Sequence, residues 1–469
     1  MKISVFSKIR WVIFLLVIIS FSGAGCSTLG TQVNDNTVLP VIGRDYTTTK
    51  DQIKLVNGVM PEMVNSDFWL EKSSSSEGAI MTDEEIKTFN QKIIDELPEI
   101  YDLKSYSSSL KKEELTGFIK EYKFPNSTMY GEDGKELKKV FFDQILANIN
   151  LSEIKDSNPI LYGITIRKCN LRTFPTDAVG YNSTTRRLDH FQETGCPLGA
   201  PFLILHQSRD HEWDFIQLYN YRGWIKKDDI AVSKEKNKLF DYTESKDFLI
   251  AVDQCVIENP TSKEKIKLVM GTRMKLIKEG KDYYKVSIPN RDSKGMLVFS
   301  DINIAKTEHL NKGYLDYTYS NNIKQAFKLL GTPYDLGGKE DGYDCSSYIM
   351  SIYSTMGIRL PRNSGQQARI LGIGMSFSGS DTMEKRMKSL ETLKPGAVLC
   401  IPGHVMLYLG SYKGSHYIIH DFMGYSLNTN VGLKYVPVNA VAVSPILMHD
   451  EVGVPYLMKL TSALEFKLK

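Results

Sequence analysis

The sequence has almost no excess of charge of either sign. Its 469 residues include 58 lysines and arginines against 55 aspartates and glutamates, which gives a formal net charge of +3. No nucleic-acid partner is implied, because binding to a phosphate backbone normally leaves a marked basic excess. The chain also lacks a Cys-x-x-Cys pair. We therefore expect no structural zinc, and no other metal or cofactor.

The apolar run at the N-terminus, residues 11–21, is shorter than the roughly 20 residues that span a bilayer comfortably. It follows the basic residues Lys2, Lys8 and Arg10 and precedes small residues that end at Cys26. This pattern predicts a signal peptide over residues 1–25. It resembles a lipobox, which implies a lipid on Cys26 and a membrane-anchored lipoprotein of the periplasm or cell envelope. An ordinary secretory signal with an incidental cysteine is the alternative.

Cysteine is scarce, with six residues in the whole chain. Besides Cys26 and the cysteine discussed below, these are Cys169, Cys196, Cys255 and Cys400. An exported protein can pair such residues. Cys169 and Cys196 fall in one predicted domain and could meet, but the pairing stays open. The alternative is that all four are buried as small apolar residues.

A chain of this length predicts three or four domains. After a polar linker, residues 26–44, the pattern is mostly helical over 45–155, with a helix start at Thr82-Asp83-Glu84-Glu85. Alternating strands separated by turns then predict two small β-barrels, over 156–235 and 240–308. The remaining residues, 312–469, combine helices with strands. The expected fold class is therefore multidomain α+β.

The most informative motif is Asp344-Cys345-Ser346. Apolar residues follow it at helical spacing, which predicts that Cys345 lies in the first turn of a helix with Asp344 as its N-cap. The positive end of a helix is expected to lower the pKa of a thiol. His404 begins a predicted strand, and His420 lies on the next. A cysteine facing two histidines is the arrangement of papain-like thiol hydrolases.

The third residue of such a site has two candidates, His420 and its neighbour Asp421. Adjacent residues of a strand point to opposite faces, so only one of them can reach His404. We expect it to be His420.

Five short blocks together resemble the NlpC/P60 cell-wall peptidases. They are Leu330-Gly331-Thr332-Pro333-Tyr334, Gly337-Gly338, Asp344-Cys345-Ser346-Ser347, Leu393-Lys394-Pro395-Gly396-Ala397 and Gly403-His404-Val405. The resemblance implies a papain-like α+β peptidase domain in which Cys345 is the nucleophile, His404 the base and His420 its orienting partner. It also implies that Asp344, Ser346 and Ser364 hold the amino end of the substrate.

The rest of the chain is similar to the other parts of such enzymes. The barrels resemble bacterial SH3-like domains, and the helical segment resembles an N-terminal stabilising domain. The resemblance implies cleavage of the γ-D-glutamyl–diamino acid bond in peptidoglycan stem peptides, as muropeptides with a free N-terminal L-Ala. The diamino acid stays open. A departure from the family pattern, residues 372–391, is expected to be a loop near the site.

Two other functions remain open at this point. One is a non-catalytic wall-binding or adhesion lipoprotein. The other is an amidase or acyltransferase on the same thiol scaffold.

Overall fold

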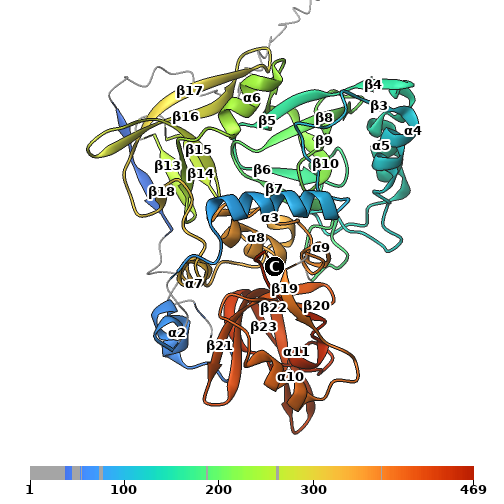
Figure 1. Ribbon diagram of the computed structural model, residues 1–469. Helices are drawn as coiled ribbons and strands as arrows, with labels where there is room; N and C mark the ends of the chain where they lie inside the picture. Colours follow the sequence, from blue (N-terminus) through green and yellow to red (C-terminus); the bar gives the residue numbers. More distant parts are fainter. Residues whose placement is uncertain are drawn as a thin grey trace, which may run out of the picture.

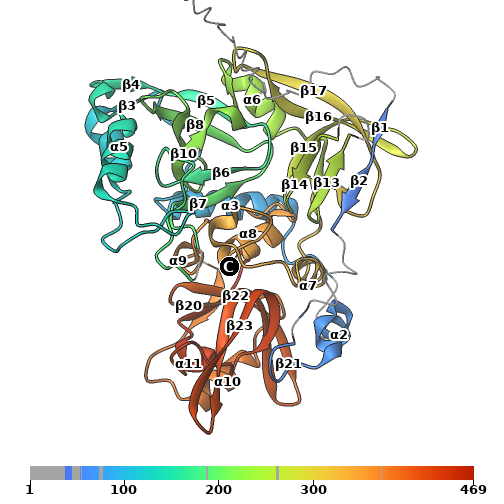
Figure 2. The same cartoon turned by 180° about the vertical axis from the view of Figure 1, so that it is seen from behind.

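The computed structural model describes residues 37–44, 53, 55–72, 78–185, 188–259, 263–370 and 372–468. The predicted signal peptide and Cys26 lie outside these residues. Within them, no helix combines the length and apolar character needed to cross a membrane. Two barrels lie side by side, and the C-terminal domain lies beneath them with helix α3 between the two levels (Figures 1 and 2). The multidomain α+β prediction is confirmed.

The first barrel is a seven-stranded sheet with the order β11-β5-β8-β9-β10-β6-β7. Both faces of its central strands are buried: Phe215 and Trp224 belong to one apolar cluster and Phe202 to another. Strand β7 lies at the edge of this sheet. The strands are β5 (Leu161–Thr165), β6 (Cys169–Arg172), β7 (Gln192–Cys196), β8 (Pro201–Gln207), β9 (Trp213–Gln217), β10 (Arg222–Lys226) and β11 (Ile230–Ser233), with η3 (Lys227–Asp229) before the last.

The second barrel takes two strands from the N-terminus of the chain. Its sheets have the orders β1-β17-β16-β15-β12-β18 and β14-β13-β2. The described part of the predicted linker therefore forms barrel strands instead of a free tether. The elements are β1 (Val38–Leu39), β2 (Val41–Gly43), β12 (Phe248–Ala251), β13 (Cys255–Glu258), β14 (Lys265–Leu268), β15 (Arg273–Glu279), β16 (Tyr283–Arg291), β17 (Leu297–Ala305) and β18 (Leu310–Lys312); α6 (Lys236–Thr243) joins the barrels.

The helical N-terminal segment has no core of its own, unlike the separate domain expected from the sequence. Its first part packs into the core of the C-terminal domain, through Trp69, Phe89 and Ile93. Its second part packs against the first barrel, through Leu115 and Ile145. The elements are η1 (Pro61–Val64), α2 (Ser66–Lys72), α3 (Asp83–Glu96), β3 (Ser109–Lys111), α4 (Lys112–Lys120), α5 (Lys139–Ile149), η2 (Leu151–Glu153) and β4 (Ser157–Pro159).

Helix α3 begins where the sequence predicts. Thr82 caps it, and Glu85 returns a hydrogen bond to the backbone of Thr82, which completes a capping box. Its buried face then packs beside the aromatic core of the C-terminal domain, where Phe89 contacts Phe466. The helix thus fills the space between the barrels and the C-terminal domain.

The C-terminal domain packs helix α8 against an antiparallel sheet of order β19-β24-β20-β21-β22-β23. Helix α8 contacts β21 and β22, the two strands on which the predicted histidines lie. The elements are α7 (Tyr319–Lys328), η4 (Leu336–Gly338), α8 (Cys345–Ser354), α9 (Ser364–Gln367), β19 (Ile373–Ser376), α10 (Met383–Leu390), β20 (Val398–Ile401), β21 (His404–Tyr412), β22 (Ser415–Thr429), β23 (Gly432–Pro445), α11 (Tyr456–Lys459) and β24 (Ser462–Glu465).

The stretch 372–391, expected to be a loop, instead carries strand β19 and helix α10. Gly374 allows β19 to approach β24, because a Cβ there would lie 2.4 Å from the carbonyl oxygen of Ala463. The buried Arg386 donates to the carbonyl oxygens of Leu457 and Leu460. These bonds fasten the stretch to the C-terminal end of the chain, so it belongs to the scaffold of the domain.

Candidate active site

Cys345 is the first residue of α8, and its position is set by the residues on either side. Asp344 is the N-cap and accepts a hydrogen bond from the backbone of Ser347, while the Ser347 hydroxyl accepts one from the backbone of Asp344. This capping box fixes the start of the helix. Tyr348 and Ile349 are completely buried and hold α8 against the sheet. The thiol is thereby placed at the end of a rigid element.

The structure reverses the expected shift of the thiol. Burial raises the pKa of Cys345 to about 12, and the neighbouring Asp344 carboxylate acts in the same direction, although the thiol accepts a hydrogen bond from the backbone of Val405. The positive end of a helix cannot offset both effects. Burial also lowers the pKa of His404 to about 4. The thiol and the imidazole are therefore both neutral at rest.

His404 and His420 lie together, as the sequence analysis expects. Nε2 of His404 lies 2.7 Å from Nδ1 of His420, and Nε2 of His420 lies 2.9 Å from the hydroxyl of Ser444. One pair of tautomers satisfies both bonds, in which His420 donates to Ser444 and accepts from His404. Nδ1 of His404 is then unprotonated and free to act as a base. Ser444 was not found from the sequence, because a lone serine on a strand carries no signal.

Asp421 points the other way and makes no such contact. It is completely buried, and neither carboxylate oxygen has a hydrogen-bond partner among the described residues. Burial, with Asp344 and Asp335 nearby, raises the pKa of Asp421 well above its ordinary value. At neutral pH it is a protonated acid beneath α8. A buried polar group without partners costs stability.

Asp421→Asn is therefore expected to stabilise the protein while leaving hydrolysis intact. The unfolded chain releases the Asp421 proton above about pH 4 and the folded chain does not, so wild-type stability falls as pH rises. The variant should gain about 1–3 kcal/mol at pH 7.5, and the gain should vanish towards pH 4. Urea unfolding at both pH values measures this. Loss of hydrolysis in folded Asp421→Asn would instead identify Asp421 as the third catalytic residue.

Asp344 is held inside the protein, which differs from its predicted contact with substrate. Nη2 of Arg362 donates to its Oδ2 at 2.6 Å, and Nη1 donates to its Oδ1 at 3.1 Å. The hydroxyl of Ser346 and the backbones of Ser347 and Gly337 donate to the same carboxylate. Burial alone would raise the pKa of Asp344, but Arg362 brings it to about 2. Five donors leave no acceptor position for a substrate ammonium group.

The other two predicted substrate-binding residues differ in exposure. Ser346 is buried and also accepts from Nη1 of Arg362 at 2.9 Å, so it belongs to the same network. Ser364 is half-buried at the start of α9, beside α8 and β21. Of the three residues, Ser364 is placed best for a direct contact.

A second carboxylate, Glu193, reaches this region from the first barrel. It accepts hydrogen bonds from the hydroxyls of Thr173 and Tyr221, and none of the ion pairs among the described residues includes it. Tyr221 lies beside Arg362 and Asn363, and burial together with Glu193 raises its pKa far enough to keep its proton. Each oxygen of Glu193 thus has one neutral donor and room for another. No local sequence pattern indicates this, because strand β7 ends at Cys196, far before the motif that begins at Asp344.

Tyr334, from the Gly331-Thr332-Pro333-Tyr334 block, adds a hydroxyl to the site. Burial raises its pKa above the ordinary value, and the nearby Cys345 and Asp344 act in the same direction. The phenol stays protonated at neutral pH, so it can donate a hydrogen bond close to the thiol. The sequence motif contained this residue but did not assign it a role.

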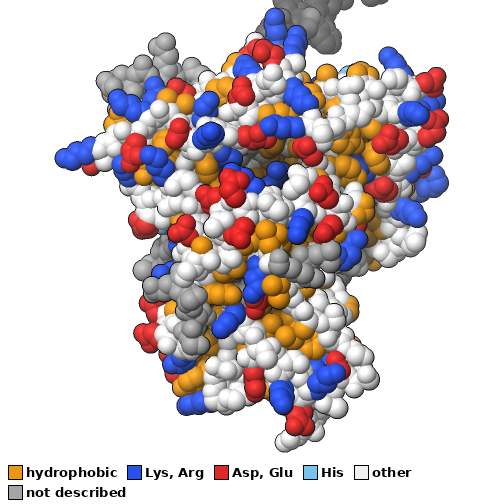
Figure 3. Space-filling model, in the orientation of Figure 1, with side chains coloured by type: hydrophobic (Ala, Val, Ile, Leu, Met, Phe, Trp, Pro, Cys, Tyr) orange, Lys and Arg blue, Asp and Glu red, His pale blue; other side chains and the backbone are white. Residues whose placement is uncertain are grey.

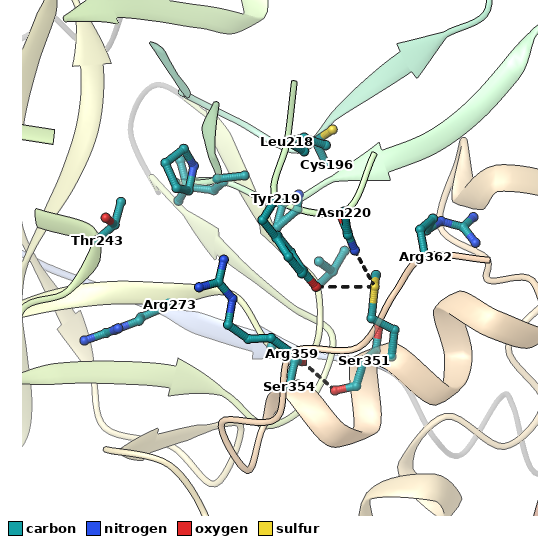
Figure 4. Close-up of a pocket in the computed structure, with 18 of the residues that line it drawn as sticks. Cys196, Leu218, Tyr219, Asn220, Thr243, Arg273, Ser351, Ser354, Arg359 and Arg362 are labelled. Atoms are coloured by element: carbon teal, nitrogen blue, oxygen red, sulfur yellow. Dashed lines mark hydrogen bonds between the residues drawn. The ribbon is translucent and has the colours of Figure 1, made fainter. Parts of the chain in front are cut away.

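A cavity of about 350 Å³ lies on the opposite side of α8 from the thiol. Both barrels line it, as do Ser351 and Ser354 of α8 and Tyr219 of the first barrel (Figure 4). Arg359 packs over the ring of Tyr219, 4.3 Å from its centre. Figure 3 shows this face hollowed between the barrels, with basic side chains in the hollow. Cys345 does not line the cavity, so the thiol lies outside it.

The described residues contain no group of three or more His, Cys, Asp or Glu side chains arranged to hold a metal. What the site does contain is a thiol, an imidazole held by a second imidazole, and donors beside the thiol. Such a set can carry out nucleophilic attack on a carbonyl with proton transfer.

Two family models match the chain. Residues 331–433 match the NlpC/P60 family, and residues 181–226 match an SH3 domain of the SH3b1 type. The first region includes Cys345, His404 and His420, and the second lies within the first barrel.

Three known proteins are similar to parts or most of the chain. A gamma-D-glutamyl-L-lysine dipeptidyl-peptidase of Bacillus subtilis is 28% identical over 197 residues, which cover 42% of this chain and 60% of that protein. One of the same name from Bacillus cereus is 28% identical over 153 residues, covering 32% and 44%. The alignments thus span less than two thirds of either relative.

The third is a solved structure of an NlpC/P60 endopeptidase from Photobacterium damselae subsp. piscicida. It matches with a TM-score of 0.72 at 18% identity and covers 88% of this chain and 99% of that one. At this identity the match establishes a shared fold across the barrels and the C-terminal domain.

Proposed function

We propose that the protein is a cysteine endopeptidase of peptidoglycan stem peptides, on the premise that residues 331–433 of its C-terminal domain match the NlpC/P60 family. The observation that carries the proposal is the hydrogen-bonded pair of His404 and His420 on strands that pack against the helix beginning at Cys345. A wall-binding protein without activity would have no need of this arrangement.

The reaction begins with two neutral groups. As the Cys345 sulfur attacks the peptide carbonyl, Nδ1 of His404 takes the thiol proton, and the bond to His420 stabilises the imidazolium that forms. The proton then passes to the leaving amine, and an acyl-enzyme remains. His404 next removes a proton from water, which attacks the acyl carbon and releases Cys345. The backbone N–H of Cys345 and the hydroxyl of Tyr334 are the proposed donors to the carbonyl oxygen.

The proposed scissile bond is that between γ-D-glutamate and a diamino acid. This follows the activity for which the two similar Bacillus proteins are named. The proposed location is the cell envelope, with a lipid on Cys26 as the anchor, as the N-terminal sequence pattern predicts.

We further propose that the substrate has a free N-terminal amine and that Glu193 binds it. Asp344 is saturated by its five donors, whereas Glu193 has neutral partners and remaining acceptor positions. Tyr221 connects Glu193 to the neighbourhood of Arg362, whose guanidinium adjoins the residue before the nucleophile. The first barrel thereby closes the amino end of the cleft, which excludes peptides still joined to muramic acid.

The direct test is incubation with L-Ala-γ-D-Glu-diamino acid peptides, once free and once amide-linked to muramic acid, with mass analysis of the products. Release of the diamino acid from the free peptides at a much higher rate is expected. Absence of cleavage between glutamate and the diamino acid in either substrate would overturn the proposed function. Equal rates on both peptides would support the peptidase activity but would contradict recognition of a free N-terminal amine.

Glu193→Gln is expected to lower kcat/KM on the free peptide by about 10–100-fold, mainly through KM. The amide keeps the shape and can still bond both hydroxyls, accepting through its oxygen and donating through its nitrogen, but it has no charge for the ammonium group. Such a charge pair is worth about 1.5–3 kcal/mol. Steady-state kinetics measures it. Glu132→Gln is a suitable control, because Glu132 lies in the N-terminal segment before α5 and likewise accepts a hydrogen bond from a tyrosine, Tyr181. An unchanged KM would refute the contact.

A further inference from the structure

Two cysteines that the mechanism does not use lie directly opposite one another in the first barrel. Strands β6 and β7 are antiparallel, and Cys169 and Cys196 are partners in their register. Both are buried, and the two thiols are in hydrogen-bond contact. Directly opposed residues of antiparallel strands have Cα atoms about 4.5–5.5 Å apart, which lies inside the range of disulfides. The register of the two strands therefore permits a disulfide between them.

We propose that Cys169 and Cys196 form a cross-strand disulfide that fastens edge strand β7, the strand that carries Glu193, to the first barrel. The bond is a covalent modification of the barrel, and its formation does not depend on the peptidase activity. Its consequence for catalysis does rest on the function proposed above.

The proposed disulfide would hold β7, which contacts the C-terminal domain. This strand pairs only with β6 in the described sheet and lies against η4 of the C-terminal domain. Thr194 of β7 accepts a hydrogen bond from Nε of Arg362 at 2.7 Å, and Gln192 donates to the carbonyl of Gly337. A Cβ on Gly195 would lie 2.6 Å from the carbonyl oxygen of Gly338, so the two backbones are in close contact. Glu193 is on the same strand.

The ladder between β6 and β7 is also irregular. Its register shifts between Leu171 and Arg172, beyond which Arg172 pairs with Gln192. Cys169 and Cys196 lie at the regular end of the ladder, where β7 continues towards the wall of the interdomain cavity that Cys196 lines (Figure 4). A covalent bond there holds the strand that carries Glu193 and Thr194, which pairs with β6 alone in the described sheet.

The chemistry is thiol–disulfide exchange with an external disulfide as the oxidant. The thiolate of one cysteine attacks a sulfur of that disulfide and releases one of its thiolates; the second cysteine then attacks the mixed disulfide and releases the other. Two thiol protons are lost, and two electrons pass to the oxidant. In the reduced protein, the hydrogen bond with Cys196, together with burial, holds the pKa of the Cys169 thiol well above its ordinary value. Exchange in the folded protein is therefore slow, and the bond forms as the strands pair during folding.

The chain contains matched controls. Cys255 faces Leu268 and Gly43 in its sheet, and Cys400 faces Val405 and Ser462, so neither is opposite another cysteine. Both are as buried as the proposed pair.

The test refolds the mature chain with oxidised glutathione or with a reductant, then denatures it without reduction and alkylates free thiols. In the oxidised sample Cys255, Cys345 and Cys400 should be alkylated, whereas Cys169 and Cys196 should appear in one linked peptide lighter by two hydrogens. Alkylation of both, or glutathione retained on either one, would overturn the proposal. This result is independent of any substrate.

The second arm compares the oxidised and reduced forms of the same chain. The oxidised form should melt roughly 3–8 °C higher, and its KM for the free-amine peptide should be severalfold lower, with kcat nearly unchanged. Cys255→Ala should retain this difference, and Cys169→Ser/Cys196→Ser should abolish it. Equal melting temperatures for the linked and reduced forms would refute the clamp. If the peptide is not cleaved at all while the bond forms, the proposed function fails and the disulfide stands.

Discussion

Cys345→Ala is expected to reduce peptide hydrolysis by a factor on the order of 10⁴ or more, because the thiol forms the covalent bond to the substrate. The fold should persist. Asp344 caps α8 through its own side chain, and an alanine at the first helical position removes only the sulfur. Rates on free stem peptide, with circular dichroism and melting curves for each protein, measure the outcome. Cys400→Ala is the matched control, since Cys400 is also buried but lies on β20.

Replacing His404 should reduce hydrolysis more than replacing His420. His404→Ala is expected to be nearly as severe as loss of the thiol, because the resting thiol is protonated and needs a base. His420→Ala should be milder, since His420 acts by orienting His404 through a 2.7 Å bond. If folded Cys345→Ala hydrolysed the peptide at the wild-type rate, Cys345 would not be the nucleophile. Full activity in His420→Ala would show that the bond between the rings has no role.

Arg362→Met is expected to lower the free energy of unfolding by about 3–5 kcal/mol at neutral pH, the usual cost of breaking a buried ion pair from one side. Arg362 is 3% exposed and supplies two of the five donors to Asp344. Without it, the buried carboxylate has no cation. Hydrolysis should also fall sharply, because Asp344 and Ser346 flank the nucleophile and would lose their positions.

The pH dependence of this loss has a definite sign. In the wild type, the pKa of Asp344 is held at about 2, so its contribution is complete above about pH 4 and is lost as the pH falls towards 2. In Arg362→Met, protonation of Asp344 relieves the unpaired charge. The gap between variant and wild type should therefore be largest at pH 7 and shrink below pH 4.

Denaturant unfolding at pH 7 and at pH 3.5 measures how much Arg362→Met lowers the free energy of unfolding at each pH. The matched control is Arg359→Met, because Arg359 is exposed and packs on Tyr219 without reaching Asp344. Adding Asp344→Asn to Arg362→Met should restore part of the stability, since it removes the orphaned charge. A loss below about 1 kcal/mol for Arg362→Met alone would show that the buried pair contributes little to folding.

The local sequence was sufficient to predict the elements around the thiol. Capping boxes depend on residues three apart, and those at Thr82 and Asp344 are read directly from the chain. The choice of His420 over Asp421 as the neighbour of His404 followed from strand alternation, and the 2.7 Å bond agrees with it. The order of five short blocks was enough to indicate the NlpC/P60 family, and residues 331–433 match that family.

What the sequence could not decide depends on contacts between distant segments. The pKa of Cys345 follows from desolvation by the whole domain, so helix position alone predicted the wrong direction. Asp344 appeared free to bind an ammonium group until folding brought Arg362 to it. Cys169 and Cys196 become opposed only when β6 and β7 pair. Glu193 comes near the C-terminal domain only because β7 packs against η4. Sequence patterns report residues a few positions apart, whereas burial and charge pairing arise from tertiary packing, and these decided the chemistry of the site.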